Sequence, residues 1–322
     1  MTGLITILRK ELGDQFRSKR YIILFLLIFV TSIFASYTAA QTIREVVGQV
    51  LGRTTPSTFV FLYLFTASGG IFPSFLTIIS LLGPIVGIAL GFDAINSEQT
   101  NGTLSRVIAQ PIYRDSFING KFLAGLMIIV VMLLSIFLII GGFGLKLLGV
   151  PPTPEEIIRI AVFFVLSVAF IGFWMGLAVL FSILFRRPAT SALGALALWL
   201  FLLLFVGVIA NLIATNVVST DRASATATQE ELQVQQANVS SMVNRISPTT
   251  LFGEASSTVL DPTQRTTGPL LSSQTVGMVP SPLPLGQSLV LVWPQLTSLI
   301  ALTALCFGIS YVSFMRREVR AT

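Results

Sequence analysis

The chain has 322 residues, of which 53% are apolar and only 11% are charged, and its mean hydropathy is +0.85. Soluble domains carry about 25% charged residues, so this composition predicts a membrane protein. The net charge of +6 does not indicate nucleic-acid binding, because the basic residues flank apolar runs and form no patch interleaved with aromatic residues.

The residue types that the sequence lacks exclude common catalytic chemistries. The chain has no histidine, which excludes Ser-His catalysis, HExxH zinc chemistry and His-ligated metals. Its one cysteine, Cys306, allows no internal disulfide and no CxxC site. The sequence also contains no GxxxxGK[ST] phosphate-binding loop. We therefore expect no catalytic site, metal or cofactor in this chain.

Residues 1–20 predict an amphipathic helix at the membrane surface. One helical face is apolar and consists of Leu4, Ile5, Leu8, Leu12 and Phe16. The opposite face carries Arg9, Lys10, Asp14 and Arg17. A helix with a basic polar face is suited to the lipid headgroup region. A cytosolic helix with a basic flank is the alternative interpretation.

Six apolar runs are long enough to cross a bilayer, which requires about 20 residues. In chain order they are residues 21–40, 73–92, 122–148, 160–185, 189–213 and 292–315. The shorter run at 59–65 is either a re-entrant or interfacial piece or the start of the second span. The first run is too long for the apolar region of a cleaved signal peptide. The sequence thus predicts an all-α polytopic membrane protein with six transmembrane helices.

A polar segment, residues 214–291, separates the fifth and sixth spans. Apolar residues at helical spacing predict a helix over 229–246, and Ser247-Pro248 predicts the start of another over 248–260. Residues 261–288 are rich in Pro, Gly, Ser and Thr and predict a loop. We expect this segment to form a helical extracytoplasmic subdomain. The chain would then divide into the surface helix (1–20), five spans (21–213), this subdomain, and the sixth span with a basic tail (292–322).

The distribution of Lys and Arg predicts the orientation in the membrane. Thirteen of the 20 Lys and Arg residues lie in the N-terminal segment, the 91–122 loop, the turn at 186–187 and the C-terminal tail. Basic residues are enriched in cytoplasmic loops, so we expect both termini and the 91–122 loop in the cytoplasm.

The loop between the second and third spans carries charges that cannot lie in hydrocarbon. Residues 91–122 read GFDAINSEQTNGTLSRVIAQPIYRDSFINGKF. Asn101-Gly102 is a turn signal, and Thr103 can cap a short helix that Pro111 ends near residue 109. Asp115 can cap the third span. We also expect Glu98 to pair with the basic face of the N-terminal helix, namely with Arg9, Lys10 or Arg17.

The same loop resembles that of the ABC-2 type export permeases of the ATP-binding-cassette transporters. The resemblance rests on Asp93, Glu98, Gly102-Thr103-Leu104, Pro111-Ile112, Arg114 and Gly120-Lys121, taken in order. In that family the loop, here 93–116, is the coupling helix that docks on the ATPase subunit. Gln99 departs from the basic residue that the family often has. An ordinary polar loop is the alternative interpretation.

The resemblance implies a permease subunit of an ATP-driven exporter in the plasma membrane of a prokaryote. It implies a dimer with a second copy or a homologue, and cytoplasmic ATPase subunits that bind ATP and Mg. The implied coupling residues are Asp93, Glu98, Gly102, Thr103, Arg106, Pro111, Arg114, Arg186 and Arg187. The implied residues of the interfacial helix are Arg9, Lys10 and Arg17. For Arg186 and Arg187, a role in setting orientation alone is equally open.

Residues 75–121 are most similar to the permeases associated with nitrous-oxide reductase maturation, which implies sulfur or copper supply. Drug, peptide, lipid and sodium export remain open. The alternative function is a secondary transporter or channel, with an intramembrane hydrolase as a third possibility. Spans two to six carry no Asp, Glu or Lys at mid-depth, where ion-driven carriers place ionisable groups, and this disfavours the alternative.

Overall fold

The computed structural model describes residues 2–50, 59–69, 72–100, 102, 113–149, 151–221, 229–264 and 282–316. Among these residues, six helices are long and apolar enough to cross a membrane, as predicted. They are α2 (Lys19–Val50), α4 (Phe75–Gly91), α7 (Arg114–Leu148), α8 (Pro154–Leu184), α9 (Pro188–Asp221) and α13 (Leu285–Arg316). The shorter helices are α1 (Thr2–Phe16), α3 (Tyr63–Thr66), α5 (Asn96–Thr100), α10 (Gln229–Asn244) and α11 (Pro248–Leu260).

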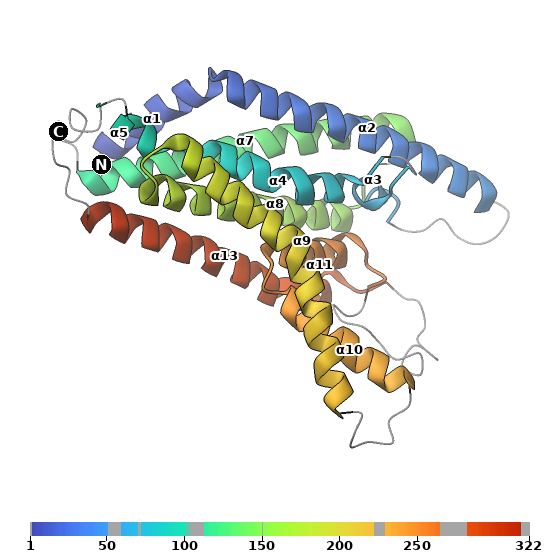
Figure 1. Ribbon diagram of the computed structural model, residues 1–322. Coiled ribbons are helices and arrows are strands. Elements are labelled where there is room, and N and C mark those ends of the chain that lie inside the picture. Colours follow the sequence, from blue (N-terminus) through green and yellow to red (C-terminus); the bar gives the residue numbers. More distant parts are fainter. Residues whose placement is uncertain are drawn as a thin grey trace.

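The long helices form an elongated bundle with two distinct ends (Figure 1). Helices α1 and α5 and the C-terminal end of α13 lie together at one end, which we call the inner end. Helix α3 lies at the opposite, outer end. Helix α9 is inclined to the other spans, and α10 returns along it, held by a bond from Ser240 Oγ to Asn211 Oδ1 of 3.1 Å.

Helices α4 and α8 approach one another most closely where α4 carries glycine. A Cβ atom added to Gly87 would lie 2.5 Å from the carbonyl oxygen of Ile171, and one added to Gly91 would lie 2.6 Å from that of Met175. Small residues at four-residue spacing let helix backbones meet in a membrane. Helix α8 is the most buried of the six spans.

The segment before α4 folds into the outer end of the bundle as a separate piece. Four phenylalanine rings meet there with centroids 5.4–6.1 Å apart, in edge-on and tilted pairs: Phe65, Phe75, Phe137 and Phe163. Helix α4 begins only after Ser74, whose Oγ accepts the N–H of Thr77. The interpretation of 59–65 as the start of the second span is therefore wrong.

The start of one helix differs from the sequence-based expectation. Helix α7 begins at Arg114, so Asp115 lies in its first turn and the N-cap is Tyr113. The predicted helices over 229–246 and 248–260 are present as α10 and α11, but α11 packs into the bundle. Its Phe252 ring stacks on Phe170 of α8 at 4.4 Å. The apolar face of α11 explains this, because it needs a partner surface that a polar subdomain does not offer.

The glycine contact of α4 can be tested by comparing two glycine-to-alanine substitutions. We expect Gly87→Ala to destabilise the protein by roughly 1–3 kcal/mol, because the added methyl group meets the backbone of α8. Gly141→Ala in α7 is the control, since nothing lies within 4 Å of its Cβ position. Thermal unfolding of the detergent-purified protein measures both, and equal midpoints would contradict the close approach.

The orientation that the Lys and Arg distribution predicts can be tested by cysteine labelling. In a Cys306→Ser background, Ala189→Cys places an exposed thiol at the inner end, and Asn238→Cys places one on α10. We expect an impermeant thiol reagent to label only the Asn238→Cys protein in intact cells, because the Lys and Arg distribution predicts that the inner end faces the cytoplasm. The opposite labelling pattern would reverse the topology.

Candidate functional site

The segment that follows α4 is fastened to α8 through one hydroxyl group. The N–H groups of Ile95 and Asn96 donate to Ser182 Oγ of α8 at 2.9 and 3.1 Å. Asn96 is fully buried, and its Nδ2 donates to the carbonyl of Phe92. Ser182 thus satisfies N–H groups near the start of α5 that the helix leaves unpaired. No sequence pattern indicated this role, since Ser182 lies in an apolar run.

A lysine at the start of α7 joins two carboxylates from other elements. Lys121 Nζ lies 2.8 Å from Glu11 of α1 and 2.9 Å from Glu98 of α5. The three side chains are only 9%, 14% and 15% exposed. Such charge-assisted bonds are stronger than bonds between neutral groups. Lys121 therefore connects α1, α5 and α7 at a single point.

This pairing corrects the expected partner of Glu98. We expected Glu98 to meet the basic face of α1, whereas the structure pairs it with Lys121, which in turn binds the acidic Glu11. Lys10 lies 4.0 Å from Glu11 and from Asp14, on the exposed side of α1. The correction arises because α1 turns a carboxylate, and not its basic residues, toward the bundle.

A second ion pair holds the loop where it leaves α4. Asp93 Oδ2 lies 2.7 Å from the guanidinium of Arg20, at the start of α2. The same guanidinium lies over the ring of Phe92, 5.3 Å from its centroid. The loop is thus attached to α2 by Asp93 and to α7 by Glu98.

An apolar cluster lies beneath the loop and joins five parts of the chain. Its members come from α1, the 92–95 segment, α7, α8 and α13: Ile7, Ile95, Phe117, Ile118, Val179, Ile183 and Phe314. Helix α1 presses on α7 where the latter has Gly120, whose added Cβ would lie 2.8 Å from Ile7 Cγ2. Ile7, which lies outside the predicted apolar face of α1, is buried, whereas Ile5 and Phe16 of that face are exposed.

The structure divides the residues predicted for coupling and for the interfacial helix into inward-facing and exposed ones. Asp93 and Glu98 point inward and form ion pairs with other helices, and Arg114 is half-buried. The exposed residues are Arg9, Lys10, Arg17, Arg186 and Arg187. The ring of Tyr113, at the start of α7, is also 81% exposed, although no sequence pattern singled it out.

Gly102 has the left-handed backbone conformation that its turn requires, with φ of +67°. Thr103, Arg106 and Pro111 lie outside the described residues, as does the helix expected over 103–109. The short helix that is described, α5, lies earlier, at 96–100. In the described part of the chain, no group of three or more His, Cys, Asp and Glu residues could hold a metal ion.

These features define a polytopic helical membrane protein whose inner loop is bound to several spans at once. The family described as "ABC-2 family transporter protein" matches residues 5–319, and the chain belongs to this family. The chain is also 29% identical over 143 residues to the "Probable ABC transporter permease protein NosY" of Pseudomonas aeruginosa. That match covers 44% of this chain and 51% of the relative, so the chain spans about half the length of this curated protein.

The lysine junction predicts a large difference between two lysine substitutions. Lys121→Met leaves two largely buried carboxylates without their shared counter-ion, which costs roughly 3–5 kcal/mol. Lys10→Met is the control, because its amine is exposed and such pairs contribute about 0–1 kcal/mol. We expect only Lys121→Met to lower the thermal unfolding midpoint markedly.

Neutralising both carboxylates provides a second check on the same junction. Adding Glu11→Gln and Glu98→Gln to Lys121→Met should recover part of the lost stability, because no unpaired charge then remains. If Lys121→Met and the triple variant both unfold at the parent's midpoint, the junction contributes nothing to the stability of the fold.

Proposed function

We propose that this protein is the permease subunit of an ATP-driven exporter of the ABC type. The observation that supports this most is the binding of the inner loop to several spans at once. Asp93, Glu98 and Ile95 tie it to α2, α7 and α8. A push on the loop from a cytoplasmic partner would therefore move these spans together, which is what coupling to an ATPase requires.

The proposed docking surface consists of the exposed residues of the inner end, while Asp93 and Glu98 act as positioning residues. Arg9, Lys10 and Arg17 of α1 and the turn at 186–187 give this surface a positive charge. Tyr113 adds an exposed aromatic ring, and aromatic residues and arginine are enriched among the energetically dominant residues of interfaces. The partner surface would accordingly present carboxylates around an apolar pocket.

The proposed assembly contains two permease chains and two ATPase subunits, which bind ATP and Mg. Only 17–28% of the apolar windows of α2, α9 and α13 are buried, compared with 50–61% for α4, α7 and α8. The sides of α2, α9 and α13 that face away from the bundle are available to lipid and to a second permease copy. We place the assembly in a prokaryotic plasma membrane with the inner end in the cytoplasm.

Two substitutions in the inner loop test the coupling. Glu98→Lys puts a second cation beside Lys121, and Gly102→Val forces a β-branched residue into a left-handed conformation at a cost of about 1–3 kcal/mol. We expect both variants to insert into the membrane, since neither changes a span. Both should lose most of the ATPase subunit on co-purification or fail to stimulate its hydrolysis.

The control for this experiment is Gln235→Lys, which adds a charge at an exposed position of α10. It should bind and stimulate the ATPase as the parent does. The chain without its ATPase serves as the blank, and hydrolysis by that preparation would contradict the assignment as a permease. Parent-like coupling in both loop variants would show that the loop does not transmit the partner's movement.

A further inference from the structure

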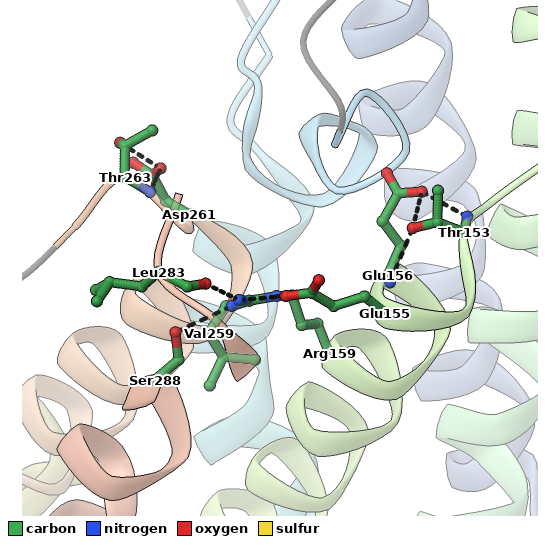
Figure 2. Close-up of polar contacts among 9 residues, drawn as sticks. All are labelled: Thr153, Glu155, Glu156, Arg159, Val259, Asp261, Thr263, Leu283 and Ser288. Carbon is green, nitrogen blue, oxygen red and sulfur yellow. Dashed lines mark hydrogen bonds and ion pairs between the residues drawn. The ribbon is translucent and has the colours of Figure 1, made fainter. Parts of the chain in front are cut away.

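The outer end of α8 carries a buried arginine that the proposed coupling mechanism does not use. The side chain of Arg159 is fully buried, although it bears a charge. Figure 2 shows its guanidinium between the α8 helix and the chain segments of Val259, Leu283 and Ser288. A buried charge requires partners to offset the loss of water, so the partners of this group are informative.

Every N–H group of this guanidinium has an acceptor. Nε and Nη2 donate to Glu155 Oε1, one turn earlier in α8, at 3.1 and 2.8 Å. Nη2 also donates to the carbonyl of Leu283 at 2.7 Å. Nη1 donates to the carbonyl of Val259 at 3.0 Å and to Ser288 Oγ at 3.2 Å. Because an arginine has five N–H donors, this set uses all of them.

The acceptors belong to three different parts of the outer end. Val259 lies in the last turn of α11, where the helix leaves carbonyl groups unpaired. Ser288 lies in the first turn of α13. Leu283 lies two residues before the start of α13, and its N–H donates to the carbonyl of Pro262 at 2.8 Å. The guanidinium carbon also lies 5.6 Å from the centre of the Phe59 ring. One side chain of α8 therefore binds α11, α13 and the segment before α3.

Glu156, three residues before Arg159 in α8, also binds the segment that precedes α3. Glu156 is 2% exposed, and its Oε1 accepts the N–H of Phe61 at 2.8 Å. Its Oε2 accepts from the N–H and the hydroxyl of Thr153, which completes a capping box (Figure 2). In the described part of the chain, the first two turns of α8 thus hold α11, the start of α13 and the segment before α3.

We propose that Arg159 is the positioning residue that keeps the outer end closed, and that α8 links this closure to the inner loop. Ser182 at the inner end of α8 binds the loop, and it lies 23 residues from Arg159, or about 35 Å along the helix. This inference rests on the proposed function, because export requires the outer end to open. A movement of the loop would then reach the guanidinium through one continuous helix.

The partners of Arg159 permit release without leaving its charge unpaired. Glu155 belongs to the same helix and its side chain is 37% exposed, so this ion pair moves with α8. Only the bonds to Val259, Leu283 and Ser288 must break when α11 and α13 separate from α8. The cost of an isolated buried charge is therefore avoided in the open state.

The test measures how fast buried thiols on the two ends react. The full-length Cys306→Ser protein in lipid nanodiscs receives either Ser256→Cys, on α11, or Ser191→Cys, near the inner end of α9, and both positions are fully buried. Labelling by a maleimide then reports local opening. We expect Arg159→Met to raise the labelling rate of the Ser256→Cys reporter about tenfold or more, and that of the Ser191→Cys reporter by less than about twofold.

Three further variants make the result specific. Arg159→Lys keeps the charge beside Glu155 but has only three donors, so its labelling rate should lie between those of the parent and Arg159→Met. Ser288→Ala removes a single acceptor and should raise the rate slightly. Arg44→Met is the matched control, because that arginine joins α2 to the carbonyl of Leu147 at the end of α7 and should leave both reporters unchanged.

The outcomes separate this inference from a merely structural role. An equal rise at both reporters would show that Arg159 only stabilises the fold, and no rise at the Ser256→Cys reporter would show that it holds nothing closed. Either result overturns the inference. The assay contains no ATPase and no nucleotide, so its result stands apart from that of the coupling experiment.

Discussion

The backbones of α4 and α8 meet at Gly87 and Gly91 with no side chain of α4 between them, and the position of the inner loop follows from this contact. Because the last turn of α4 lies against α8, the residues that follow Gly91 also lie beside α8. There Ile95 and Asn96 reach the hydroxyl of Ser182. Larger side chains in the contact would hold the helices apart and move the loop away from its anchor.

The bundle uses the same physical device at both of its ends. Lys121 at the inner end and Arg159 at the outer end are largely or fully buried cations, and each binds groups from other elements. A buried cation loses its hydration unless each of its donors has an acceptor, so it tolerates few alternative positions of its neighbours. Both ends are therefore held in defined arrangements by a few bonds, while the apolar middle of the bundle packs without such constraints.

The sequence predicted those features that depend on local pattern. Long apolar runs indicated the six spans, and the helix over 248–260 was marked by its Ser247-Pro248 start. The sequence did not predict contacts between distant segments. Glu98 could pair with several cations by charge alone, and only the packing of α1 on Gly120 brings Lys121 and Glu11 together beside it.

The same limit explains why two anchoring residues were not selected. Ser182 is a serine in an apolar run, and Arg159 follows two glutamates in the first turns of a helix, which indicates an ordinary helix start. Their partners in other elements lie more than 80 residues away in sequence. For the coupling residues, the charges in the sequence were sufficient to predict the loop. They could not predict the direction in which each charged side chain points, because that depends on the fold.

The inclination of α9 has a consequence for the membrane in which the protein resides. Its 34 residues rise about 50 Å, while the hydrocarbon core of a bilayer is about 30 Å thick. Leu204, Val208 and Leu212 are exposed along it, and tilting keeps such a long apolar surface within the lipid. A thinner bilayer demands a greater tilt of α9, and a thicker one a smaller tilt. We therefore expect the angle of this helix, and with it the position of the attached α10, to change with the thickness of the bilayer.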